Sequence, residues 1–151
     1  MLNKMIFFII ATVIVLGMVV FFMLNPSYEK SVEAKYYFET ADYNQAYKKA
    51  NEAFELDIYN RMASTIMAQS KISLKYVKYI NQAKKYLKEI KSIASDDGIT
   101  DAQRAKIKMM SEIMVESYVK LTSSVITDKE LVKQAEKYHE EFKQLLREVK
   151  R

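Results

Sequence analysis

Helix-breaking residues are nearly absent from this chain of 151 residues, which contains two glycines and one proline. Folds made of sheets and tight turns need such residues at their turns. The chain is instead rich in Ala, Leu, Ile, Met, Lys, Glu and Gln, which favour helices. We therefore expect an all-α protein.

An apolar segment without a single charge occupies residues 5–24, and fourteen of its twenty residues are Ile, Leu, Phe or Val. As a helix it would span about 30 Å, the thickness of the hydrocarbon layer of a bilayer. The alternative is a buried strand or core helix, but a strand of this length is rare. A cleaved signal peptide would need small residues just beyond the segment, and residues 24–28 do not provide them. We expect an uncleaved transmembrane signal-anchor within residues 1–24.

The charges around this segment indicate its orientation. Lys4 precedes it, whereas Lys30 and Lys35 follow it and are balanced by Glu29 and Glu33. A short basic leader favours its own end staying in the cytoplasm, and long following domains count weakly. We therefore expect a single-pass protein of the inner (cytoplasmic) membrane whose soluble domain, residues 25–151, is periplasmic.

The soluble part is expected to form six helices. Their approximate ranges are 27–40, 43–56, 61–76, 78–95, 101–122 and 128–150. Gly98 supplies a left-handed stop after the fourth of them. Thr100 with Gln103, and Thr127 with Glu130, fit the capping box that begins a helix.

The last of these helices has a continuous apolar stripe at alternating spacings of four and three residues. The stripe consists of Leu131, Ala135, Tyr138, Phe142, Leu145 and Val149. We expect it to pack on the preceding hairpin as a closing helix. A coiled-coil dimer is the alternative, although the stripe is barely three heptads long.

Residues 34–60 carry the most specific pattern in the chain. It comprises Ala34 and Tyr37, the turn Ala41-Asp42-Tyr43, then Ala46, Ala50, Ala53, Phe54, Leu56-Asp57 and Asn60. The pattern resembles a tetratricopeptide repeat, in which small residues let two helices pack closely across a tight turn. The proline that ends the Leu-Asp-Pro motif of that family is replaced here by Ile58, which makes this helix boundary less well marked.

A weaker copy of the pattern follows. Ala68 stands 34 residues after Ala34, the period of the family, but Lys71 replaces the aromatic residue. The resemblance implies a short solenoid with hairpins at about 27–56, 61–95 and 101–150, of which the third has no recognisable motif. At least three such units are usually needed for stability.

Residues suited to catalysis are scarce. The chain has no cysteine, one histidine and no glycine-rich loop, so we expect no catalytic site, no cofactor and no metal centre. Glu136 and His139 have the Glu-x-x-His spacing of di-iron bundles, but those sites need a second such pair. A histidine at the rim of the apolar stripe is the simpler interpretation.

Charge is distributed unevenly along the soluble part. Residues 27–60 carry seven acids and four bases, a net charge of −3, whereas residues 61–100 carry eight bases and three acids, a net charge of +5. The candidate basic surface consists of Lys71, Lys75, Lys78, Lys84, Lys88 and Lys91. It would suit an acidic partner or anionic lipid headgroups, and the alternative is two solvated helix faces with the interleaved tyrosines in the core. Nucleic acid is not favoured, because Lys greatly outnumbers Arg.

These features together predict a membrane-anchored scaffold or adaptor for protein–protein interaction, with assembly or chaperoning of envelope proteins as its setting. The partner would be a protein or peptide, and the bilayer would contact residues 5–24. In the family that the chain resembles, the first helix of each repeat lines a concave groove. The corresponding positions here are Tyr28, Ser31, Lys35, Phe38, Met62, Thr65, Gln69 and Ile72. The alternative function is a structural or sensor subunit packed permanently on a partner membrane protein.

Overall fold

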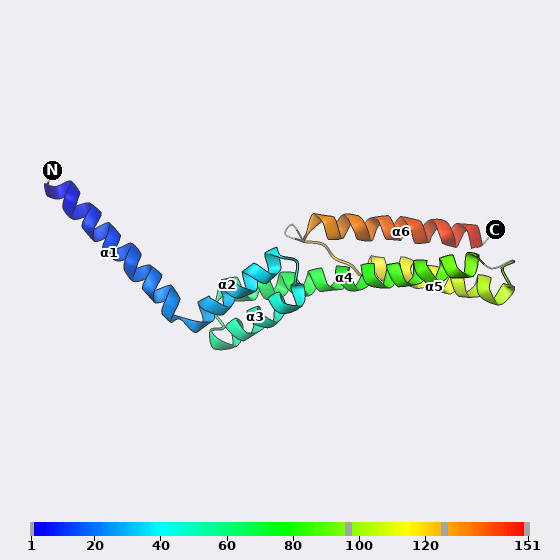
Figure 1. Cartoon of the computed structure of the whole chain (residues 1–151), viewed down its shortest axis with the longest axis horizontal. Coiled ribbons are helices and arrows are strands. Elements are labelled where there is room, and N and C mark those ends of the chain that lie inside the picture. Colours follow the sequence, from blue (N-terminus) through cyan, green and yellow to red (C-terminus); the bar gives the residue numbers. More distant parts are fainter. Residues whose placement is uncertain (1, 96–97, 125–126, 150–151) are drawn as a thin grey trace. The chain divides into compact units, whose positions relative to one another are not determined.

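The computed structural model describes residues 2–95, 98–124 and 127–149, and this part of the chain contains helices and no strand. The all-α prediction is therefore confirmed. The chain divides into two compact units, Met1–Ser70 and Lys71–Arg151, which we call unit 1 and unit 2. Figure 1 shows the helices of each unit in chain order.

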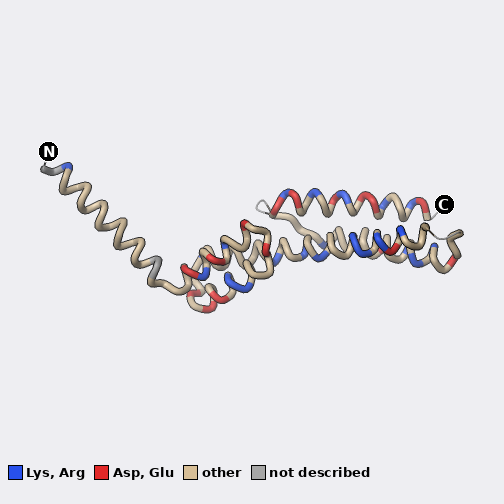
Figure 2. Tube along the Cα trace, viewed as in Figure 1, with Lys and Arg blue, Asp and Glu red and all other residues tan. Residues whose placement is uncertain are grey.

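Helix α1 (Leu2–Leu24) begins unit 1. Its window Lys4–Phe21 is long and apolar enough to cross a membrane, and none of it is buried by the rest of the protein. The one hydroxyl within this window, on Thr12, donates to the carbonyl oxygen of Phe8 at 2.8 Å, so the helix satisfies that polar group itself. Figure 2 shows the helix without charge beyond its beginning.

One residue, Asn25, separates α1 from helix α2 (Pro26–Glu39). Its side-chain oxygen accepts the amide hydrogen of Ser27 at 3.1 Å, and Pro26 occupies the first turn, where no amide hydrogen is needed. Asn25 is therefore the residue at which one helix ends and the next begins.

Unit 1 is completed by helix α3 (Tyr43–Leu56) and the beginning of helix α4 (Arg61–Ala94). The predicted small residues are buried at the contact between α2 and α3: Ala34, Ala46, Ala50 and Ala53 are each fully inaccessible to solvent. Ile66 of α4 packs on the same cluster. Two ion pairs also join α2 and α3, from Lys30 to Glu52 at 2.8 Å and from Lys49 to Glu33 at 2.6 Å.

The turn between α2 and α3 is a Schellman motif. The amide of Ala41 donates to the carbonyl oxygen of Phe38 at 3.1 Å, and the amide of Asp42 donates to the carbonyl oxygen of Tyr37 at 2.9 Å. Ala41 adopts a left-handed conformation with φ of 61°, at the position where the tetratricopeptide family usually has glycine. Asp42 then begins α3 by accepting the amide hydrogen of Gln45 at 3.1 Å.

Helix α4 corrects the predicted boundaries. One continuous helix of 34 residues replaces the expected helices 61–76 and 78–95, so the expected second hairpin does not form. The physical reason is that residues 74–80, around the expected boundary, include no glycine, no proline and no capping residue. Five described helices therefore follow α1, where six were expected.

Unit 2 is a three-helix bundle of the later part of α4, helix α5 (Asp101–Val119) and helix α6 (Lys129–Val149). Consecutive helices run in opposite directions (Figure 1). Its core is built from large side chains, among them Tyr76, Ile80, Ile107, Met114 and Phe142. All six residues of the predicted α6 stripe belong to this core or pack against it, so α6 is the closing helix that we expected.

The helix caps of unit 2 were predicted with mixed success. The capping box of Thr100 and Gln103 is present, and Gly98 has a left-handed φ of 93°. The second predicted capping box is wrong by one residue. Asp128 accepts the amide hydrogen of Glu130 at 2.8 Å, because the hydroxyl of Thr127 instead accepts the amide hydrogen of Ser124 at 2.8 Å.

Candidate functional site

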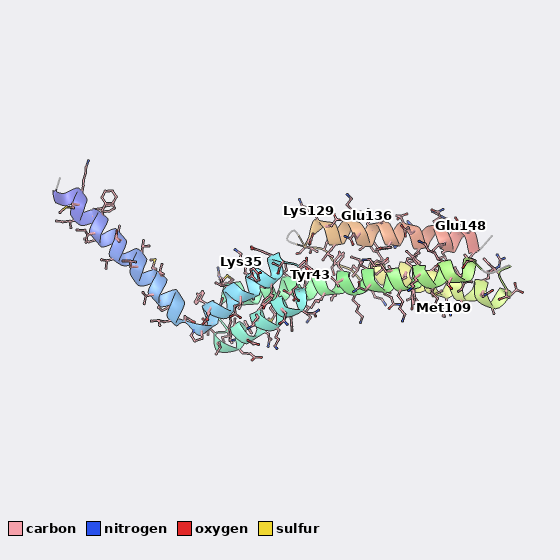
Figure 3. All side chains as sticks on the ribbon, in the orientation of Figure 1. Lys35, Tyr43, Met109, Lys129, Glu136 and Glu148 are labelled. Atoms are coloured by element: carbon pink, nitrogen blue, oxygen red, sulfur yellow. The ribbon has the colours of Figure 1, made fainter. Side chains whose placement is uncertain are left out.

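A groove of about 520 Å³ lies between α2 and the beginning of α4, within unit 1. It is lined by Lys35, Phe38, Glu39, Arg61, Met62, Thr65, Ile66 and Gln69. Five of the eight predicted groove residues are in this set: Lys35, Phe38, Met62, Thr65 and Gln69. Lys35 is labelled in Figure 3.

The groove combines apolar and charged side chains. Phe38, Met62 and Ile66 provide its apolar part, and the ring of Phe38 is held edge-on against Tyr43 with ring centroids 5.4 Å apart. Lys35 and Arg61 add positive charge, and Glu39 adds negative charge. Lys35 approaches Glu39 at 3.7 Å in an exposed pair that contributes little to stability. Such a lining suits a short amphipathic peptide segment.

Three predicted groove residues lie elsewhere. Ser31 is fully buried and donates to the carbonyl oxygen of Ser27 at 2.9 Å. Tyr28 is half-buried and does not line the groove. Ile72 packs against the core of unit 2, because the continuous α4 carries it beyond unit 1.

A buried polar network, which the sequence reasoning missed, holds α2 to the start of α4. The side-chain nitrogen of Asn60 donates to the hydroxyls of Ser27 and Ser31, both at 2.8 Å. The Ser27 hydroxyl donates to the carbonyl oxygen of Ala53 at 2.8 Å, and Asn60 also accepts the amide hydrogen of Ala63. An asparagine directly before a helix is the sequence signal of a cap, but its second role depends on a tertiary contact.

The predicted basic surface divides into two patches. All six lysines are exposed. At roughly 100° per residue, Lys71, Lys75 and Lys78 lie about 140° around the helix axis from Lys84, Lys88 and Lys91. Tyr76 and Tyr79 between them are buried in the core.

A second cleft, of about 380 Å³, lies between α4 and α5 in unit 2. Lys75 and Lys78 of the predicted basic surface line it, and Lys120 joins them from the end of α5. Sequence reasoning could not find Lys120, because no local pattern relates it to α4. Tyr79 also lines the cleft, and its buried hydroxyl has no hydrogen-bond partner among the described residues.

His139 stacks on Tyr118 with ring centroids 4.1 Å apart. Burial lowers the pKa of His139 from its usual 6.5, and Lys143 lowers it further against the opposing effect of Glu140 and Glu136. Its position beside the apolar stripe agrees with the rim interpretation, although one ring nitrogen, Nδ1, is buried without a partner among the described residues. In the described part of the chain, no three His, Asp or Glu side chains are placed to hold a metal ion.

Comparison of the chain with protein-family models, with curated proteins and with solved structures found no match. The tetratricopeptide resemblance therefore rests on the residues of α2, α3 and their turn alone.

Proposed function

We propose that this protein is a membrane-anchored interaction scaffold that docks a peptide or protein segment in the groove between α2 and α4. The observation that carries the proposal is the groove itself, in which an apolar part formed by Phe38, Met62 and Ile66 is bordered by charges of both signs. An occupant would bury apolar side chains there and pair its own charges with Lys35, Glu39 and Arg61. This role is one of binding, without catalysis.

The resemblance of residues 34–60 to a tetratricopeptide repeat supports this proposal. Alanines at the α2–α3 contact, a tight turn at Ala41 and a following helix that packs on the hairpin are the features that the resemblance implies. In that family the groove is lined by the first helix of successive repeats, and the proposal assigns α2 and the start of α4 to those places.

Helix α1 is the proposed anchor. Its length, its apolar surface and the satisfied hydroxyl of Thr12 suit a bilayer. The leader with Lys4 favours an inner membrane location with the helical units in the periplasm, where assembly or chaperoning of envelope proteins would use the groove. A reporter that is active only outside the cytoplasm, fused after Arg151, should be active. A silent reporter at normal expression would reverse this orientation.

Site-specific photocrosslinking in intact cells tests the docking role. A photoreactive amino acid at Thr65 or Gln69, inside the groove, should give a defined crosslinked product. The same group at the exposed Asn44 of α3 should not give it. Phe38→Ala combined with Met62→Ala should remove the product while the protein remains folded and in the membrane. Equal crosslinking from Asn44, or a product that survives the double substitution, would contradict docking in this groove.

A permanently packed structural or sensor subunit is the second candidate. It is favoured by apolar side chains on α5 that stay partly exposed, with Met109 54% and Ile113 39% exposed. Figure 3 labels Met109. Met109→Ser with Ile113→Ser should release a copurifying partner in that case, whereas the groove crosslink should persist if the scaffold proposal is correct.

A further inference from the structure

The connection between α3 and α4 exposes a cluster of large apolar side chains. Leu56, Ile58 and Tyr59 are 56%, 62% and 85% exposed, and they fall within four consecutive positions. We call residues 56–59 the apolar loop. Isolated exposed apolar residues are ordinary, but three in one turn, including Tyr59, the most exposed of the large hydrophobic side chains described, form a patch that water solvates poorly.

The buried polar network places this loop beside the end of α1. Asn60 is the next residue after the loop, and its side-chain nitrogen donates to the hydroxyl of Ser27 at 2.8 Å. The Ser27 hydroxyl donates to the carbonyl oxygen of Ala53, near the end of α3, at 2.8 Å. Ser27 follows Leu24, the last residue of α1, by three residues, which is about 10 Å of fully extended chain at most. Figure 1 shows the start of α2 and the α3–α4 connection at the same end of unit 1.

The backbone of the loop is organised by its own hydrogen bonds. The Asp57 carboxylate accepts the amide hydrogen of Tyr59 at 2.9 Å, and the Asp57 carbonyl accepts that of Asn60 at 3.1 Å. The Asp57 amide in turn donates to the carbonyl oxygen of Ala53 at 3.1 Å. These three amide hydrogens therefore need no water, which lowers the cost of presenting Ile58 and Tyr59 to a less polar environment.

We propose that the apolar loop is a second membrane contact, in which Leu56, Ile58 and Tyr59 insert into the interfacial layer of the bilayer that α1 crosses. This inference rests on the anchoring part of the proposed function. Tyrosine suits this layer because its ring is apolar and its hydroxyl is polar. The charged neighbours Glu55, Asp57 and Arg61 limit insertion to the headgroup level, since charges are costly in the hydrocarbon.

Depth-dependent fluorescence quenching tests this contact in the full-length protein. The chain has no cysteine, so single substitutions can each carry one environment-sensitive fluorophore. The labelled positions are Tyr59→Cys in the loop, Val13→Cys in α1 and Asn44→Cys at the opposite end of α3. Each variant is reconstituted into phosphatidylcholine vesicles with spin-labelled lipids whose quencher is near the headgroup or deep in the acyl chain.

The label at residue 59 should shift its emission to shorter wavelength and lose intensity with the shallow quencher, whereas the label at residue 44 should do neither. In a background of Leu56→Ser and Ile58→Ser, the quenching at residue 59 should fall. In a matched background of Val32→Ser and Tyr36→Ser, exposed apolar residues of α2, it should not change.

The label at residue 13 distinguishes failure of this inference from failure of the anchor. Quenching of residue 13 by the deep quencher with no quenching of residue 59 would overturn the loop contact and leave the anchor in place. No quenching at either position would overturn both. Emission at residue 59 that shifts without lipid quenching would mean that protein covers the loop, which also contradicts the proposal.

Discussion

The two units of this protein are both helical, but they are held together by different means. In unit 1 the buried contact between α2 and α3 is formed largely by alanines, with two ion pairs beside it, and the side chain of Asn60 holds the start of α4 to two serine hydroxyls. In unit 2 the core consists of Tyr, Ile, Met and Phe side chains, and Phe142 is fully buried.

The two kinds of core tolerate different substitutions. Close helix packing through alanines leaves no room for a larger side chain, and a buried polar network loses directional bonds when one member is removed. A core of large apolar side chains tolerates swaps that conserve volume, but it is sensitive to the loss of volume. Unit 1 should therefore depend on fit and hydrogen bonding, and unit 2 on buried apolar area.

The largest effect is expected in unit 2. Phe142→Ala should destabilise it by about 3–5 kcal/mol, because the substitution removes a fully buried ring and leaves a cavity. Met114→Leu is the control and should cost less than about 1.5 kcal/mol, since it conserves volume. Hydrogen exchange of the detergent-solubilised protein would report each unit separately. Equal loss of protection in peptides of unit 1 would contradict independent stability of the two units, since they would then unfold together.

Removal of the Asn60 side chain should have the next largest effect, this time in unit 1. Asn60→Ala loses a helix cap and two buried hydrogen bonds, for a cost of about 2–4 kcal/mol. Asn60→Ser can still cap α4 but does not reach both serines, so it should cost less than Asn60→Ala. Chemical denaturation would measure both. Identical stabilities of the two variants would show that the bonds to Ser27 and Ser31 contribute nothing.

Enlarging a residue at the α2–α3 contact sharpens the contrast with unit 2. Ala50→Leu should cost about 1–3 kcal/mol by overpacking a residue that is fully inaccessible to solvent. The same substitution at the exposed Ala68 of α4 should change the free energy of unfolding by no more than about 0.5 kcal/mol. An Ala50→Leu variant that melts at the parent temperature would remove the main support for close, tetratricopeptide-like packing.

A small gain in stability is expected at the turn of unit 1. Ala41→Gly should stabilise the protein by about 0.5–1 kcal/mol, because glycine adopts the left-handed φ of 61° without the steric cost of a side chain. Ala105→Gly, at an exposed position inside α5, should instead cost about 0.5–1 kcal/mol. Destabilisation by both substitutions would mean that the turn is not strained.

The smallest effect concerns the pH dependence of unit 2. The pKa of His139 is lowered in the folded state, so protonation favours the unfolded state and the stability falls as the pH falls below about 6.5. His139→Phe keeps an aromatic ring against Tyr118 but cannot be protonated. Thermal unfolding of this variant should therefore depend less on pH between about 7 and 5 than that of the parent. Parallel profiles would show that other groups cause the dependence.

Local sequence signals predicted most of the fold and about half of the candidate site. The helix class, the alanine contact, the closing stripe of α6 and the cap at Thr100 all depend on residues close together in the chain. The helix boundary expected near residue 77 was wrong. The repeat period suggested a turn there, but no glycine, proline or capping residue ends the helix. Ser31 was placed in the groove because the repeat pattern cannot show that Asn60 needs a buried acceptor there.

The lysine-lined cleft and the apolar loop illustrate what local patterns leave out. Lys120 joins Lys75 and Lys78 only through the antiparallel packing of α4 and α5. The apolar loop occupies the place of a Leu-Asp-Pro motif, so its sequence indicated a weak helix end. Its place in the fold depends on the hydrogen bond from Asn60 to Ser27, which lies three residues beyond the end of α1.

The single residue between α1 and α2 has a consequence for the strength of binding. Because Asn25 is the whole connection, the proposed anchor α1 would keep the proposed groove close to the bilayer, and the groove would meet partners only within that thin layer. A partner held in the same membrane would meet it at an effective concentration in the millimolar range, as for two sites joined by a short linker. A dissociation constant of about 100 μM in free solution, a free energy of only about −5.5 kcal/mol, would then suffice for nearly full occupancy.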